Sequence, residues 1–187
     1  MIPLEENQGI KTNRKIMRGY TQVYTGDGKG KTTAALGLAV RSAGAGLKVF
    51  IAQFIKSNHY SELKALKRFS DLITVEQFGL GLFIGRKPSP SDIEAAAKGL
   101  EKVKSVISSG EYNVVILDEA NVAVKYELFS KQELIDIIAF KPEDIELVIT
   151  GRDASPDIIE ISDLVTEMKA VKHYYTKGVK ARNGIEK

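Results

Sequence analysis

The residues with the clearest chemical meaning are three alternating glycines followed by a lysine and a threonine. Gly26, Gly28 and Gly30 precede Lys31 and Thr32, and an alanine-rich helical pattern follows them. Glycine lets the backbone curl so that several N–H groups face one anion, and the next helix adds the positive end of its dipole. The lysine can reach phosphate oxygens, and the threonine hydroxyl can bind magnesium. The segment therefore predicts a loop that binds nucleotide phosphates.

The loop departs from the general pattern G-x-x-x-x-G-K-[ST] at its first position, where this chain has Thr25. A dinucleotide-binding fingerprint fits less well, because the glycines are spaced G-x-G-x-G rather than G-x-G-x-x-G. The alternative is a glycine-rich surface turn with a chance Gly-Lys-Thr. The strand-like run before the loop and the helical pattern after it both favour phosphate binding.

Composition sets the class of protein. The chain has 187 residues, 43% hydrophobic and 27% charged, as expected for a soluble globular protein with a sizeable core. Residues 1–18 are polar and lack periodicity, so we expect a flexible arm before a single domain over residues 19–187. The absence of cysteine excludes disulfides and suits a reducing cytoplasm. No apolar run could span a membrane, and a formal charge of +3 does not by itself indicate nucleic acid. We therefore expect a cytoplasmic protein with neither as a partner.

The rest of the chain alternates strand-like apolar runs with helical patterns. We expect strands at residues 20–24, 48–54, 73–78, 114–117, 147–150 and 164–168. Helices are expected at 33–42, 61–69, 91 to about 110 and 130–140, with one more starting at Ser155-Pro156; Ser91 with Glu94 and Ser130 with Glu133 form capping boxes. The alternation predicts an α/β fold of three layers, a mostly parallel sheet with helices on both faces, like that of P-loop NTPases.

Charged residues follow several of the predicted strands. In an open parallel sheet ligands lie at the carboxyl ends of strands, so Asp118 or Glu119 can complete magnesium coordination beside Thr32. Their alternative role is a solvated turn or a helix cap. Arg152 can contact phosphate oxygens, or it can form a surface ion pair with a neighbouring aspartate. Lys56 is either a second cation for a triphosphate or simply solvated.

Two further stretches have an unusual composition. Residues 78–85 are apolar and glycine-rich, which suits either a wall for a large flat substrate or packing within the loop. Residues 169–187 are basic and include Tyr174 and Tyr175, so they face either an anionic ligand or, as we favour, solvent. His59 and His173 have no metal-ligand spacing, and we assign them to the surface or to local structure.

Six segments taken together resemble the ATP:corrinoid adenosyltransferase family, in the version with a modified phosphate loop. They are residues 23–35, 53–56, 116–119, 149–152, 171–173 and 178–181. The resemblance extends from Tyr20 to the C-terminus. It implies transfer of the 5′-deoxyadenosyl group of ATP to the cobalt(I) of a corrinoid, with release of triphosphate, in adenosylcobalamin biosynthesis or salvage. It also implies that ATP is turned end for end, so that the ribose 5′-carbon faces the corrin.

The resemblance also implies roles for individual residues. Lys31 and Glu119 would be catalytic, and Thr32, Asp118 and Glu119 would hold Mg²⁺ or Mn²⁺. Where the family often has a Gly-Phe-x-Trp element, this chain has Leu82, Phe83 and Ile84 after Gly81, which are the candidates for corrinoid contact. A homodimer and an electron-donating flavoprotein or other reductase are the implied partners. The implied nucleotide-binding residues are Thr25, Gly26, Asp27, Gly28, Lys29, Gly30, Lys31, Thr32, Thr33, Lys56 and Arg152.

Two other functions use the same loop. A kinase or NTPase would bind the nucleotide in the ordinary direction and release ADP or diphosphate-type products. A regulatory module would bind the nucleotide without turnover.

Overall fold

A computed structural model of the chain describes residues 18–57, 60–81 and 87–186. Six strands form one sheet in the order β3-β2-β4-β5-β1-β6, and each neighbouring pair is parallel. The predicted α/β architecture is confirmed, with a sheet that is wholly parallel. The strands are β1 (Thr21–Thr25), β2 (Val49–Phe54), β3 (Ile73–Phe78), β4 (Val114–Asp118), β5 (Glu146–Thr150) and β6 (Leu164–Glu167).

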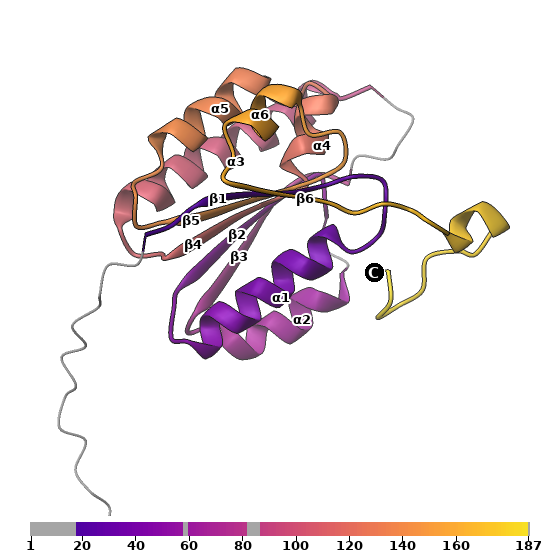
Figure 1. Cartoon of the computed structure of the whole chain (residues 1–187), viewed down its shortest axis with the longest axis horizontal. Helices are drawn as coiled ribbons and strands as arrows, with labels where there is room; N and C mark the ends of the chain where they lie inside the picture. The colour runs from indigo at the N-terminus through magenta and orange to yellow at the C-terminus, as the bar shows by residue number, and fades with distance from the viewer. Residues whose placement is uncertain (1–17, 58–59, 82–86, 187) are drawn as a thin grey trace, which may run out of the picture.

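Helices cover both faces of the sheet. In Figure 1, α1 and α2 lie on one face, and α3 to α6 lie on the other. Each layer buries its own apolar cluster against the sheet. The helices are α1 (Lys31–Gly44), α2 (Ser61–Leu66), α3 (Pro90–Ser109), α4 (Ala120–Lys125), α5 (Lys131–Phe140) and α6 (Pro156–Glu160), with short 3₁₀ helices at Lys67–Phe69 and Tyr174–Lys177.

The central strands β2 and β4 are buried along their whole length, which explains their nearly continuous apolar sequences. Successive side chains of a strand point to opposite faces. Accordingly, Phe50 and Phe54 of β2 pack in the cluster under α3, whereas Val49 and Ile51 pack in the cluster under α1. Gln53 is the one polar side chain of this buried strand, and its amide proves to belong to the candidate site.

The start of α3 differs from the sequence prediction. Ser89 is the N-cap: its hydroxyl accepts from the Asp92 N–H at 3.3 Å, and the Asp92 carboxylate accepts from the Ser89 N–H at 2.8 Å. The expected capping box of Ser91 with Glu94 is therefore wrong. Pro90 starts the helix earlier because the first helical position needs no N–H donor. The box of Ser130 with Glu133 in α5 is confirmed.

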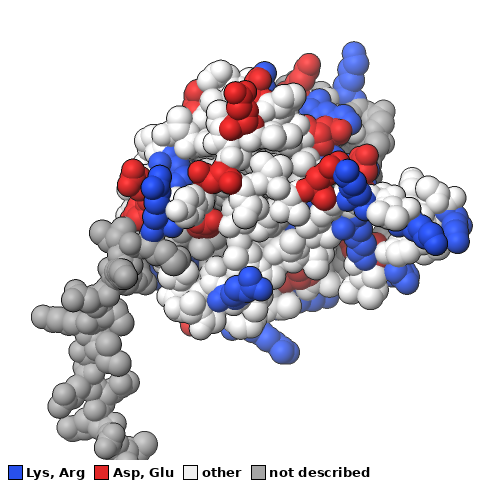
Figure 2. Space-filling model, viewed as in Figure 1, with Lys and Arg blue, Asp and Glu red and all other residues white. Residues whose placement is uncertain are grey.

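All strands are parallel, so the loops that follow them emerge at one edge of the sheet, where α1 also begins. The C-terminal tail (residues 169–186) extends from β6 on this side, shown in yellow in Figure 1. Figure 2 shows acidic and basic side chains interspersed over the face in view. Within the described ranges, no helix is long and apolar enough to cross a bilayer.

Candidate functional site

The glycines of the loop after β1 serve both a turn and a close approach. Gly26 has φ +92° and Gly30 has φ +121°, values that residues with side chains rarely adopt. A Cβ at Gly26 or at Gly28 would lie 2.6 Å from the Met168 carbonyl oxygen, so the chain after β6 packs directly on the loop. The Gly28 N–H donates to that same oxygen at 2.6 Å. This amide is therefore already occupied, which the sequence did not indicate.

Lys31 is buried within the loop that it follows. Its ammonium donates to the carbonyl oxygens of Gly26 at 2.6 Å and of Gly28 at 2.7 Å. Burial, together with the positive charge of Arg152, lowers the pKa of Lys31 below its ordinary value. Gly30 caps α1, and the first turn of this helix contains no acidic residue of its own, so the positive end of its dipole is available to an anion. An anion bound at this point would interact with both the Lys31 ammonium and the positive end of the α1 dipole.

Asp118 connects four elements at the carboxyl edge of the sheet. Its Oδ1 accepts from the hydroxyl of Thr32 at 2.9 Å and of Thr150 at 2.8 Å. Its Oδ2 accepts from the ammonium of Lys56 at 2.8 Å and from the amide of Gln53 at 3.2 Å. The carboxylate is buried, so these donors are what makes its charge tolerable there.

The Lys56 ammonium is held among several acceptors. Besides Asp118, it lies 3.3 Å from the Thr32 hydroxyl, 3.7 Å from the Glu62 carboxylate and 5.1 Å from the centre of the Tyr60 ring. Burial alone would lower the pKa of Lys56, but the charge and hydrogen bond of Asp118 outweigh it and raise the pKa above its ordinary value. The side chain therefore remains a cation.

Glu119 adopts a left-handed backbone conformation, with φ +62°, at the N-cap of α4. Its N–H donates to the Thr150 hydroxyl at 3.0 Å. Burial, and then the charge of Asp118, raise the pKa of the Glu119 carboxyl. A half-buried acid with a raised pKa beside a second carboxylate is a place where a cation would relieve unfavourable charge.

The oxygens of Thr32, Asp118 and Glu119 fit a hard divalent cation, which prefers such ligands. In the portion of the chain that the structure describes, no cluster of three or more His, Cys, Asp or Glu could enclose a metal by itself. An ion here would thus share its coordination with a bound phosphate, as Mg²⁺ commonly does.

Most of the predicted site residues line one cavity of about 650 Å³. Thr25, Gly26, Asp27 and Asp118 do not line it; the Thr25 hydroxyl instead accepts from the Ala154 N–H at 3.2 Å, and Asp27 is exposed. A larger hollow of about 1,100 Å³ lies along α2 and β3, but none of the described residues that line it carries a carboxylate. The predicted residues that line the smaller cavity are Gly28, Lys29, Gly30, Lys31, Thr32, Thr33, Lys56, Glu119 and Arg152.

Arg152 lies on the cavity wall. The two aspartates considered as its ion-pair partners are engaged with lysines, Asp153 with Lys125 at 2.6 Å and Asp157 with Lys131. This arrangement favours a ligand contact over the surface ion pair.

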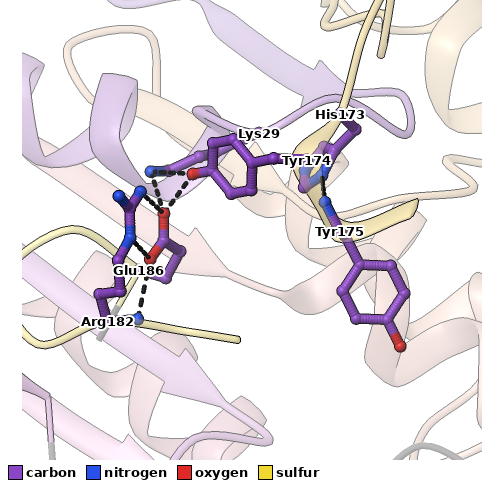
Figure 3. A network of polar contacts seen from close by, with 6 residues as sticks. All are labelled: Lys29, His173, Tyr174, Tyr175, Arg182 and Glu186. Carbon is purple, nitrogen blue, oxygen red and sulfur yellow. Dashed lines mark hydrogen bonds and ion pairs between the residues drawn. The ribbon is translucent and has the colours of Figure 1, made fainter. Parts of the chain in front are cut away.

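The C-terminal tail contributes a wall that sequence reasoning missed. His173, Gly184, Ile185 and Glu186 line the cavity. The Glu186 carboxylate accepts from Lys29 of the phosphate loop at 2.9 Å, from the Arg182 guanidinium at 3.0 Å and from the Tyr174 hydroxyl (Figure 3).

The same network includes Tyr174 and lowers the pKa of Glu186. The Lys29 ammonium also donates to the Tyr174 hydroxyl at 3.1 Å, and Arg182 lies 5.1 Å from the centre of the Tyr174 ring. Arg182 is the main cause of a Glu186 pKa well below its ordinary value. The tail was expected to face solvent; its side chains are largely exposed, but the carboxylate of Glu186 is anchored to the loop.

Three other residues near the site were not assigned roles from the sequence. Thr150 bridges Asp118 and Glu119, and Gln53 contacts Asp118. The sequence did contain a signal for Gln53, because a single polar residue in an otherwise apolar strand often has a functional role. Asn121 is buried and donates to the Gly151 carbonyl at 3.3 Å, and its Oδ1 has no hydrogen-bond partner among the described residues. His173, assigned to local structure, accepts from the Tyr175 N–H at 3.1 Å.

Some predicted residues lie outside the described part of the chain. These are the corrinoid candidates Leu82, Phe83 and Ile84, residues 1–17 of the arm, and His59. Their assignments stay predictions.

Comparison with known proteins places this site in a family. The sequence model of the family described as ATP:corrinoid adenosyltransferase BtuR/CobO/CobP matches residues 17–186. A corrinoid adenosyltransferase of Sinorhizobium sp is 35% identical, over 97% of this chain and 85% of that protein. The corrinoid adenosyltransferases of Pseudomonas aeruginosa and of Escherichia coli K12 are each 34% identical, over 90% of this chain and over 84% and 86% of theirs. The chain therefore belongs to the ATP:corrinoid adenosyltransferase family.

Proposed function

We propose that this protein transfers the 5′-deoxyadenosyl group of ATP to the cobalt(I) of a corrinoid and releases triphosphate. The observation that supports this most directly is the cavity at the N-terminus of α1, where Lys31, Lys56 and Arg152 face the same space as Thr32 and Glu119. Cations and a helix N-terminus suit a polyphosphate, and the oxygens suit its metal ion. Family membership supplies the reaction.

In this proposal the phosphate loop holds the triphosphate. Lys31 transfers its hydrogen bonds from the loop carbonyls to phosphate oxygens, and Lys29, Thr33 and Arg152 contact the phosphates from the rim of the cavity. Gly28 and Gly30 keep the backbone close to the nucleotide, and Gly26 permits the turn that leads to them. Thr25 and Asp27 do not line the cavity, so we assign them to the shape of the loop.

Thr32, Asp118 and Glu119 would hold Mg²⁺ or Mn²⁺. When bound, the ion supplies positive charge that neutralises the triphosphate. Thr32 and Asp118 are already positioned by hydrogen bonds, and Glu119 is kept beside them by its bond to Thr150. The chain has no cysteine, and its sequence shows no Ser-His-Asp arrangement, so we assign to it alignment and charge stabilisation alone.

The chemistry needs no more than that. The electron pair of cobalt(I) forms the bond to the ribose 5′-carbon, and the pair of the broken carbon–oxygen bond leaves with the triphosphate. Holding the reacting atoms in line and stabilising the leaving charge are then the tasks of the site. Leu82, Phe83 and Ile84 are proposed to contact the corrin. We further propose one domain over residues 19–187 acting in a cytoplasmic homodimer, with a reductase that supplies the reduced corrinoid.

An anaerobic assay tests the proposal. Protein, ATP, Mg²⁺ and a chemically reduced corrinoid are mixed, the cobalt–carbon product is followed by its visible spectrum, and the phosphate product is identified by chromatography. We expect the organocobalt product and triphosphate in equal amounts, and neither with Lys31→Ala. Formation of ADP without a cobalt–carbon bond would instead identify a phosphoryl-transfer enzyme.

A further inference from the structure

The Lys56 ammonium lies against the oxygens to which we assign a metal ion. It is 2.8 Å from Asp118 Oδ2 and 3.3 Å from Thr32 Oγ1. The Lys56 side chain is largely buried and Asp118 is buried almost completely, so this contact is not a passing surface pair. In the nucleotide-free protein, a positive charge of the chain itself thus neutralises the carboxylate.

A strained turn directs Lys56 to this position. Ile55 has φ +69°, and the Lys56 N–H donates to the Phe54 carbonyl at 2.6 Å, which closes a three-residue turn. Positive φ is rare for a β-branched residue, and a γ-turn of this hand is strained. Such strain persists only where the surroundings enforce it, and it concentrates at functional positions.

The segment after β3 enforces this turn. A Cβ at Gly79 would lie 2.3 Å from the Ile55 carbonyl carbon, so glycine alone permits the two backbones to approach so closely. The Gly81 N–H also donates to the Ile55 carbonyl oxygen at 3.2 Å. The conformation that directs Lys56 toward β4 is therefore held at two points by the segment after β3.

We propose that Lys56 is an internal counter-cation, which occupies the metal position on Asp118 and Thr32 until metal and nucleotide arrive together. The inference rests on the metal site of the proposed function. Two cations cannot share these oxygens without repulsion, so the ammonium opposes binding of a divalent ion alone. Glu62 and the Tyr60 ring lie within reach of the ammonium and offer it partners after displacement.

Binding of Mn²⁺ in the absence of nucleotide tests the inference. Free Mn²⁺ is measured by electron paramagnetic resonance during titration of the parent, Lys56→Met and Lys56→Arg. Removal of the charge in Lys56→Met should tighten Mn²⁺ binding by about ten-fold or more, because the competing ammonium is gone. Lys56→Arg keeps the charge and should bind as weakly as the parent. Lys125→Met, which removes a lysine from an exposed pair, should also match the parent.

The other outcomes are equally informative. Adding Glu119→Gln to Lys56→Met should abolish the gain, which locates the ion at the site. Equal or weaker Mn²⁺ binding by Lys56→Met overturns the inference, and Lys56→Gln, which keeps a hydrogen-bond donor, gives the same test if Lys56→Met fails to fold. Titration of the parent with ATP present separates the two proposals: if Mn²⁺ fails to bind there, the metal site itself is wrong, whereas binding there with no effect of Lys56→Met removes only the counter-cation.

Discussion

Two lysine–carboxylate pairs beside the cavity have nearly the same length and different surroundings. Lys56 lies 2.8 Å from Asp118, and their side chains are 12% and 1% exposed. Lys29 lies 2.9 Å from Glu186, and those side chains are 40% and 16% exposed. The first pair belongs to the buried edge of the sheet. The second joins the phosphate loop to the C-terminal tail.

The difference shows that distance does not determine what a pair contributes. Removing one partner of a buried pair leaves an uncompensated charge in a medium that solvates it poorly. An exposed pair is weakened by water and by salt, and its members find other partners at little cost. We therefore expect the Asp118 cluster to be held in place until a metal ion replaces the ammonium, and the Glu186 contact to be exchangeable for a ligand at little cost.

Asp118→Asn should have the largest effect on stability. The substitution removes the nearer counter-charge of the largely buried Lys56 ammonium and leaves the more distant Glu62 carboxylate at 3.7 Å, a loss of about 3 kcal/mol in the free energy of unfolding. For a domain of this size the midpoint of thermal unfolding falls by about 10 °C. The measurement is calorimetry without nucleotide or metal.

A double variant shows whether the charge is the cause. Asp118→Asn combined with Lys56→Met removes both partners and should recover at least half of the lost stability. If the two losses simply add, the pair is not coupled, and the contrast between buried and exposed pairs has no basis here.

Glu119→Gln should have a smaller effect, of opposite sign. The pKa of Glu119 is raised in the folded protein, so its contribution to stability is complete below the ordinary pKa of 4.5 and is lost as pH rises through the folded pKa. At pH 8 the variant should be more stable than the parent and unfold at a higher temperature, because glutamine carries no charge in this desolvated place. The advantage should shrink as pH falls through the raised folded pKa and be gone below 4.5, as thermal unfolding across pH would show.

The same substitution should reduce metal-dependent turnover, since it removes a proposed ligand. Lower stability than the parent at pH 8 would show that the Glu119 carboxylate is satisfied within the ligand-free protein.

The position of the buried Lys56–Asp118 pair could largely be predicted from the sequence. Continuous apolar runs predicted the central strands β2 and β4, and parallel strands bring their carboxyl ends together. Lys56, Asp118 and Glu119 were therefore expected at one edge. Their backbone conformations were not, because positive φ at Ile55 and Glu119 contradicts local preference and is imposed by tertiary contacts.

The contact between Lys29 and Glu186 could not be predicted from the sequence. Lys29 and Glu186 are 157 residues apart, and no periodicity or turn chemistry connects them. The close packing of Met168 on Gly26 and Gly28 leaves no separate signal in the sequence, because a phosphate loop has glycines at such positions in any case.

Glu186→Gln should have the smallest effect on stability and still change ligand binding. Water reaches both side chains of the pair, so we expect only a small shift in thermal unfolding. The substitution frees Lys29 from its counter-charge, and ATP should bind a few-fold more tightly at low salt, as measured by isothermal titration calorimetry. The gain should fade in 0.5 M salt, since screening acts over a few ångströms there. Glu160→Gln, on exposed α6, is the matched control and should change nothing. Weaker ATP binding by Glu186→Gln would mean that the tail supports the nucleotide rather than competing with it, and both pairs would then belong to the fixed part of the site.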